Sequence, residues 1–199
     1  PKAVTIKDQS PSIVYRPSRP LGKGALWELV SDRHGDHTTL MLNVELLREA
    51  GARISKNLSW ERTATDACWQ LAYNPKLSFL KKVRRLVVRM GLEGALLCIR
   101  DEEGLRCTLL YDAASMEGEF QDSVPGRMVG LGSVFCAAVT AHCADGKHEG
   151  MAAAVKEGRL ASRRFLLAGF GDGAEPPAYP IGAVTQPDRN EPAIAEIAV

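Results

Sequence analysis

Residues 130–139 read GLGSVFCAAV, and this stretch decides the fold prediction. Gly130 and Gly132 flank one residue, and apolar side chains at helical spacing follow them. Glycine permits the φ angles and the close backbone approach of a tight loop, and a helix N-terminus carries about half a positive charge. The stretch therefore predicts a loop that opens a packed helix and whose N–H groups converge on an anion. A G-x-G pattern alone is equally compatible with glycines that only allow a strand and a helix to pack closely.

A second pair of glycines lies upstream. Residues 85–97, RLVVRMGLEGALL, predict a buried strand that ends in a turn at Gly91 and Gly94. A predicted hairpin and then the loop of residues 130–133 follow. This order resembles the C-terminal part of the ribokinase-like (PfkB) family of small-molecule kinases. In that family a strand ending in a G-x-x-G turn leads to a hairpin, and a G-A-G-D loop at a helix start forms the anion hole around the transferred phosphate.

The resemblance implies a site for a nucleotide or another phosphate-bearing ligand, with ATP or ADP and Mg²⁺ as the cofactor. The implied phosphate-binding residues are Gly91, Gly94, Gly130, Leu131, Gly132 and Ser133. Ser133 occupies the place of the family's aspartate, which acts as the general base, and a serine hydroxyl is too weak a base for that work at neutral pH. It can still cap a helix. Arg127 and Met128 replace the family's aspartate–threonine pair, and Arg127 either contacts a phosphate or is solvated.

Two functions follow from this mismatch. The first is a degenerate ribokinase-like domain that binds a phosphate-bearing ligand with weak catalysis or none. The alternative is an active ATP-dependent kinase of a sugar or nucleoside whose base lies outside Ser133. The carboxylates that a folded-back loop would bring to the site are Asp112, Glu117, Glu119 and Asp122.

Two pairs of residues are candidates for metal binding. Asn57 and Glu61 resemble the family's N-x-x-E motif, which organises magnesium and phosphate through water, although the spacing is one residue longer. A turn at Asn57 and a favourable position for Glu61 near a helix N-terminus explain them equally well. His34 and His37 have H-x-x-H spacing, but their polar loop offers no third ligand nearby, so we interpret it as a surface turn.

Strands and helices alternate along the chain, which predicts an α/β fold. Predicted strands cover 12–15, 38–43, 86–90, 95–100 and 105–111, and predicted helices cover 24–30, 44–50, 60–71, 131–143 and 147–167. The resemblance implies a ribokinase-like three-layer sandwich with a mostly parallel sheet and an antiparallel hairpin near one edge. We divide the chain into an extended lead-in with a short helix (1–37), a nucleotide-binding core (38–168) and a Pro/Gly-rich tail or linker (169–199).

The family's N-terminal half has no counterpart in this sequence. We therefore expect the chain to pair with that missing half or with a second copy of itself, because strands buried on both faces need neighbours on each side.

Composition argues against nucleic-acid and membrane partners. The chain has 199 residues, 45% hydrophobic side chains and a formal charge of +1, which suits one sizeable core. The densest basic cluster has no interleaved aromatic residues and is interpreted as a solvated face; it consists of Lys81, Lys82, Arg84 and Arg85. No apolar run approaches the ~20 residues that span a bilayer, and the first residues are too polar for a signal peptide.

Cysteine usage points to a reducing compartment, so we expect a cytoplasmic protein. The five cysteines are odd in number, include no C-x-x-C pair and lie in apolar segments. A symmetric hairpin closed at residues 101–104 brings Cys98 and Cys107 face to face. We interpret these facing thiols as core packing.

Overall fold

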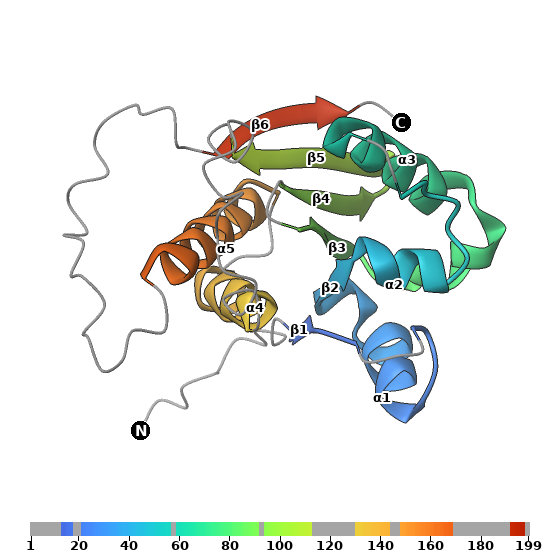
Figure 1. The fold of residues 1–199 in the computed structure, drawn as a ribbon. Helices are drawn as coiled ribbons and strands as arrows, with labels where there is room; N and C mark the ends of the chain where they lie inside the picture. Colours follow the sequence, from blue (N-terminus) through green and yellow to red (C-terminus); the bar gives the residue numbers. More distant parts are fainter. Residues whose placement is uncertain are drawn as a thin grey trace, which may run out of the picture.

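The computed structural model describes residues 13–17, 21–56, 59–91, 94–112, 130–143, 148–168 and 192–197. Six strands form one sheet in sequence order, β1 to β6 (Figure 1). The strands are β1 (Ile13–Tyr15), β2 (Thr38–Asn43), β3 (Arg85–Met90), β4 (Gly94–Asp101), β5 (Gly104–Asp112) and β6 (Pro192–Ile197). The pairings β1–β2 and β2–β3 are parallel, and those from β3 to β6 are antiparallel.

Helices cover both faces of this sheet. The first α-helix, α1 (Ala25–Glu28), runs into a π-helical turn, η1 (Leu29–Arg33), and a 3-10 turn, η2 (Gly35–His37), leads into β2. The helices α2 (Val44–Glu49) and α3 (Trp60–Tyr73) and the 3-10 segment η3 (Pro75–Lys82) pack on one face. The helices α4 (Leu131–His142) and α5 (His148–Ala168) pack on the other, as Figure 1 shows.

The two apolar faces explain why the strands read as continuous hydrophobic runs. Along β3, Leu86 and Val88 pack into the core below α2 and α3, whereas Val87 packs against α4 and α5. All three side chains are fully buried. Successive side chains of a strand point to opposite faces, so a strand covered on both sides needs apolar residues at every position.

Polar side chains cap the N-termini of α2 and α3. The Oδ1 of Asn43, the last residue of β2, accepts a hydrogen bond of 2.8 Å from the backbone N–H of Leu46. The Oγ of Ser59 accepts one of 3.4 Å from the N–H of Arg62 at the start of α3. These are the side-chain caps that asparagine and serine favour, and the first of them fixes the direction in which the chain leaves β2.

The sequence prediction of an α/β fold with a mixed sheet is confirmed, and the predicted helices and strands appear within a few residues of their expected bounds. The expectation of a mostly parallel sheet is wrong, because three of the five described pairings are antiparallel. Two elements were missed. The strand β6 lies inside the predicted tail and pairs with β5, and η3 follows α3 directly.

The face-to-face placement of Cys98 and Cys107 is confirmed by the register of the β4–β5 hairpin. No helix in the described parts of the chain is long and apolar enough to cross a membrane.

Candidate anion-binding site

The three parallel strands end at one edge of the sheet, and basic side chains gather there. Arg16 comes directly after β1, Asn43 is the last residue of β2, and Arg89 is the penultimate residue of β3. In open α/β sheets ligands bind in the crevice outside the carboxyl ends of the parallel strands. We call this side of the sheet the carboxyl edge.

The N-terminus of α4 reaches the carboxyl edge. Gly130 precedes the helix with a φ of 89°, in the left-handed region that glycine adopts without strain. Its carbonyl accepts hydrogen bonds from the N–H groups of Ser133, at 2.8 Å, and Val134, at 3.0 Å. Leu131 and Gly132 are the first two residues of the helix, and N–H groups at these positions have no acceptor within a helix. The predicted loop thus opens the helix as expected, but the Ser133 amide is already used.

Two arginines lie against this helix start. A Cβ atom on Gly132 would clash with Nη1 of Arg89 and would lie 3.2 Å from Nη2 of Arg16. The Nη1 of Arg16 donates a hydrogen bond of 3.2 Å to the Oγ of Ser133. The Arg89 guanidinium also lies over the Phe135 ring, 5.1 Å from its centre. Glycine at position 132 therefore leaves the space that both guanidinium groups occupy.

The electrostatics of this cluster favour an anion. Burial lowers the pKa of Arg89; the nearby Cys136 raises it, and the positive charge of Arg16 lowers it further. In the described parts of the chain neither Arg16 nor Arg89 is ion-paired with a carboxylate. Two guanidinium groups and the positive end of a helix thus lie together with no ion-paired carboxylate from the part of the chain that the structure describes. An oxyanion would relieve this repulsion, and arginine binds carboxylate or phosphate through two parallel N–H bonds.

A pocket of about 480 Å³ lies beside the same strand ends, and Arg89 lines it together with Asn43, Lys56 and Gly91. Arg89 therefore belongs both to the pocket and to the helix start. Arg48, another lining residue, is held in place by Glu45 and by the carbonyl groups of residues 54 and 55. The basic groups of the pocket extend the positive surface away from α4.

The two glycines of the predicted turn have different roles. Gly91 lines the pocket and has a φ of 69°, with no atom within 4 Å of an added Cβ. Gly94 is buried in β4, where an added Cβ would lie 3.1 Å from the Leu110 carbonyl oxygen and 3.2 Å from Cε of Met90. Packing of β4 on β5 accounts for Gly94, whereas Gly91 provides a turn beside the site.

Of the predicted catalytic and metal-binding residues, the structure describes Ser133 and Glu61. The exposed Ser133 accepts a hydrogen bond through its hydroxyl from Arg16, and it does not cap α4, whose N-cap is Gly130. Glu61 is exposed in the first turn of α3 and does not line the pocket. Within the described ranges no group of three or more His, Cys, Asp or Glu side chains is arranged so that it could hold a metal ion. Several predicted residues lie outside the described residues, namely Asn57, Glu117, Glu119, Asp122, Arg127 and Met128.

Sequence reasoning missed the two arginines of the site. A signal for Arg89 was present, because a charged residue follows the apolar residues 86–88 of β3 and lies on the face covered by α4. A charge is rarely placed there without a partner or a ligand. Arg16 had no comparable signal, since it follows a strand of only three residues.

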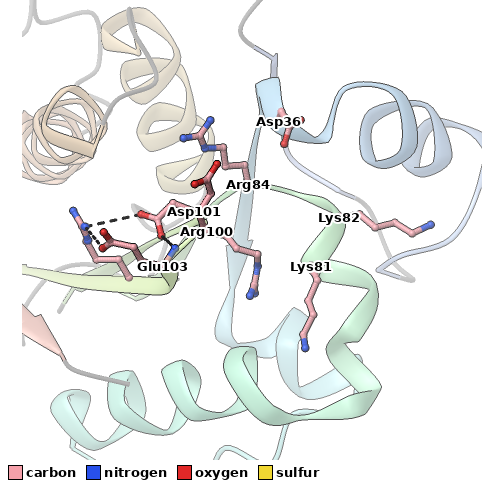
Figure 2. A pocket seen from close by; sticks show the side chains of 9 residues that line it. Asp36, Lys81, Lys82, Arg84, Arg100, Asp101 and Glu103 are labelled. Atoms are coloured by element: carbon pink, nitrogen blue, oxygen red, sulfur yellow. Dashed lines mark hydrogen bonds and ion pairs between the residues drawn. The ribbon is translucent and has the colours of Figure 1, made fainter.

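A larger pocket, of about 640 Å³, lies at the opposite end of the parallel strands, beside the turn of the β4–β5 hairpin. Figure 2 shows that its lining mixes both charges. Arg106 is within 3.9 Å of Asp101 and 3.7 Å of Glu103, and Lys82 donates a hydrogen bond of 2.7 Å to Asp32 nearby. Because Arg106 and Lys82 are paired with carboxylates of the protein, whereas Arg16 and Arg89 have no ion-paired carboxylate among the described residues, the carboxyl edge is the stronger candidate for anion binding.

No protein-family model, curated protein or solved structure gives a significant match to the chain. The functional argument therefore rests on the geometry of the site.

Proposed function

We propose that the chain is a degenerate ribokinase-like domain that binds a nucleotide or another phosphate-bearing ligand and transfers phosphate weakly or not at all. The observation that carries this proposal is the meeting of Arg16 and Arg89 with the N-terminus of α4 at the carboxyl edge. The order of the glycine turn, the hairpin and the glycine loop supports the family part of the proposal.

Each group at the helix start has a distinct part in binding. The N–H groups of Leu131 and Gly132 donate to phosphate oxygens, and the positive end of the 12-residue α4 stabilises their charge. The guanidinium groups of Arg16 and Arg89 donate from either side of Gly132. A hydrogen bond to a charged group contributes about 1.5–3 kcal/mol, so each arginine accounts for about a tenfold to hundredfold gain in affinity.

Weak catalysis follows from the missing base. The Ser133 hydroxyl already accepts a hydrogen bond from a cation, which makes it a still poorer proton acceptor. Of the described residues that line the pocket, Glu45 alone is a carboxylate, and it is ion-paired with Arg48. This donor set suits phosphate but not a resident Mg²⁺ ion. We therefore expect Mg²⁺ to enter only as the counterion of a bound nucleotide.

Calorimetric titration of the chain with ATP, ADP and inorganic pyrophosphate tests the binding. We expect saturable binding of at least one of them, weakened about tenfold or more in Arg89→Gln and in Arg16→Gln. The matched control is Arg106→Gln, which removes an arginine at the opposite end of the strands and should keep the native affinity. Thermal unfolding checks that each variant folds. Native affinity in both site variants would contradict the proposal.

A phosphate-transfer assay with sugars and nucleosides separates the degenerate domain from an active kinase. Loss of a positioned general base costs about 10²–10⁴ in rate, so we expect little or no transfer by the native chain and faster transfer by Ser133→Asp. Native turnover of about 1–100 per second would mean that the base lies outside Ser133.

We also propose that the chain associates with a second copy of itself or with a segment that corresponds to the N-terminal half of ribokinase-like proteins. Trp69 and Tyr73 stack on the outer surface of α3, with 52% and 62% of their surfaces exposed. Light scattering should report a dimer, and Trp69→Glu should return it to a monomer. A monomeric native chain in the presence of ligand would contradict self-association.

A further inference from the structure

Three cysteines from three different elements meet in the core between the sheet and α3. Cys98 of β4 and Cys107 of β5 are directly opposed in the hairpin, and their sulfur atoms are 3.3 Å apart. Cys68 of α3, the third thiol, is buried in the same core cluster. All three side chains are at most 1% exposed. Neighbouring thiols can react with one another, whereas an isolated buried cysteine has no partner thiol.

A guanidinium group with two nitrogen atoms that have no partner among the described residues lies close to these thiols in sequence. Arg100 follows Cys98 by two positions on β4 and therefore shares its face of the sheet. Its Nε and Nη2 atoms are buried and have no hydrogen-bond partner among the described residues. Burying a charge without compensation is costly, so a negative charge close by would be stabilised. The groups whose charge acts favourably on Arg100 are Cys98 and Cys107.

We propose that Cys98 and Cys107 are an oxidative modification site, a dithiol that a hydroperoxide converts to a disulfide with Cys107 as the attacking thiolate and Arg100 as its counterion. This proposal does not depend on ligand binding at the carboxyl edge.

The hydrogen bonds within the cluster select the attacking sulfur. Side-chain hydrogen bonding with Cys68 and Cys98 lowers the pKa of Cys107, burial raises it, and the charge of Arg100 lowers it. The same hydrogen bonds, together with burial, raise the pKa of Cys98 and of Cys68. Cys107 is therefore the thiol of the three that ionises first, and thiolates are the nucleophilic form of cysteine.

The chemistry balances as a two-electron oxidation. The Cys107 thiolate attacks one oxygen of the hydroperoxide, the O–O bond breaks, and Cys107 becomes a sulfenic acid while the alkoxide or hydroxide leaves. This leaving group takes up the proton that Cys107 released on ionising. The Cys98 sulfur then attacks the sulfenic sulfur, the S–S bond forms, and water leaves with the Cys98 proton. Two thiols are oxidised and one hydroperoxide is reduced to water and an alcohol, or to two waters.

The hairpin already holds the two cysteines at a suitable separation. Directly opposed residues of antiparallel strands have Cα atoms about 4.5–5.5 Å apart. Disulfides span about 4.4–6.8 Å between Cα atoms. The disulfide therefore forms by rotation of two side chains, without movement of the strands.

Arg100 also links the cysteine cluster to a pocket. It lines the 640 Å³ pocket at the hairpin turn, together with Asp101 and Glu103, which Figure 2 labels. The three cysteines do not line this pocket themselves and are at most 1% exposed, so a hydroperoxide in the pocket reaches the sulfur atoms only when the core opens locally.

Peptide mapping of the 199-residue chain tests the proposal. The chain is treated with hydrogen peroxide, free thiols are alkylated, and a tryptic digest is analysed without reduction. Cleavage after Arg89, Arg100, Arg106 and Arg127 releases residues 90–100 and 107–127 as separate peptides, one with each cysteine. We expect these two peptides to be joined after treatment and to separate again on addition of dithiothreitol.

Variants distinguish this site from general thiol oxidation. Arg100→Gln should slow formation of the joined peptides about tenfold or more, whereas Arg100→Lys should retain most of the native rate. Cys136→Ser, at a half-buried position outside the cluster, is the matched control and should leave the rate unchanged. The proposal is wrong if peroxide modifies Cys136 while Cys98 and Cys107 stay reduced, or if Arg100→Gln, shown to be folded by thermal unfolding, reacts at the native rate.

Discussion

The two ends of the parallel strands carry their charges in different ways. At the carboxyl edge, Arg16 and Arg89 lie against the start of α4 with no ion-paired carboxylate among the described residues. At the opposite end, Arg106 and Lys82 are paired with carboxylates of their own surroundings. Both ends are rich in basic residues, so composition does not distinguish them. What distinguishes Arg16 and Arg89 from Arg106 and Lys82 is whether a carboxylate of the protein is paired with them.

This difference separates a binding surface from a solvated one. Exposed ion pairs contribute about 0–1 kcal/mol and are screened by salt. Guanidinium groups beside a helix N-terminus that are not paired with a carboxylate can still donate hydrogen bonds to an external anion. Changes at the carboxyl edge should therefore alter ligand affinity, and changes at the opposite end should not.

The largest effect is expected for Gly132→Val. Its side chain would occupy the space of the Arg89 and Arg16 guanidinium groups, and we expect phosphate-ligand affinity to fall about a hundredfold or more, about 2.7 kcal/mol. The clashing atoms are the ends of flexible side chains, so the fold should persist. Isothermal titration with the ligand that the native chain binds measures the change.

The matched control for this variant is Ala137→Val. It places the same β-branched side chain at an exposed position of the same helix, away from the arginines. We expect Ala137→Val to lose a small amount of helix stability, because valine is a poorer helix former than alanine, and only Gly132→Val to lose affinity. Equal affinity in the two variants would mean that Arg16 and Arg89 do not bind the ligand.

The sequence predicted the local part of this site. The loop at residues 130–133, the helix behind it and the preceding hairpin each depend on neighbouring residues, so periodicity and turn residues were sufficient. The facing of Cys98 and Cys107 followed in the same way from the symmetry of one hairpin. Local patterns therefore located the helix start at the carboxyl edge.

The rest of the site and of the sheet depends on contacts between segments that are far apart in the chain. Arg16, Arg89 and Gly132 come together only because β1 and β3 belong to one sheet and α4 packs on its face. The strand β6 lies in a Pro/Gly-rich segment and is recognised only through its pairing with β5. Periodicity cannot reveal such pairings, which explains both the missed arginines and the overestimated parallel part of the sheet.

Smaller changes in stability and affinity are expected for two glycines near the start of β4. Gly91 precedes the strand, and Gly94 is its first residue. Gly94→Ala should lower the free energy of unfolding by about 1–3 kcal/mol, because its Cβ would press on the Leu110 carbonyl and on Met90. Ligand affinity should stay native, since this glycine is explained by packing. Chemical denaturation and titration of the same sample measure both quantities. A loss of affinity without a loss of stability would restore the binding role that the sequence implied for Gly94.

Gly91→Ala provides the comparison for that variant. Here nothing lies within 4 Å of the added Cβ, and the cost comes from the φ of 69°, about 1–2 kcal/mol for a residue other than glycine. Because Gly91 lines the carboxyl-edge pocket, we expect a modest loss of affinity along with the loss of stability. The pair therefore tests whether the carboxyl edge extends as far as β4.

The smallest effect is expected at the opposite end, for Asp32→Asn. The hydrogen bond from Lys82 is the main cause that lowers the pKa of Asp32, with a second contribution from Ser31. A carboxylate with a depressed pKa in the folded state stabilises the fold above its unfolded pKa, and this contribution is lost as the pH falls through the folded pKa. The native chain should therefore lose a little stability between about pH 4, where the unfolded carboxyl titrates, and the lower folded pKa.

Asp32→Asn should lack this part of the acid dependence and keep native ligand affinity. Urea unfolding at pH 7 and below pH 4 measures the first quantity, and titration at pH 7 measures the second. A change of affinity in Asp32→Asn would contradict the separation of the two ends, because it would couple a paired surface charge to the anion site.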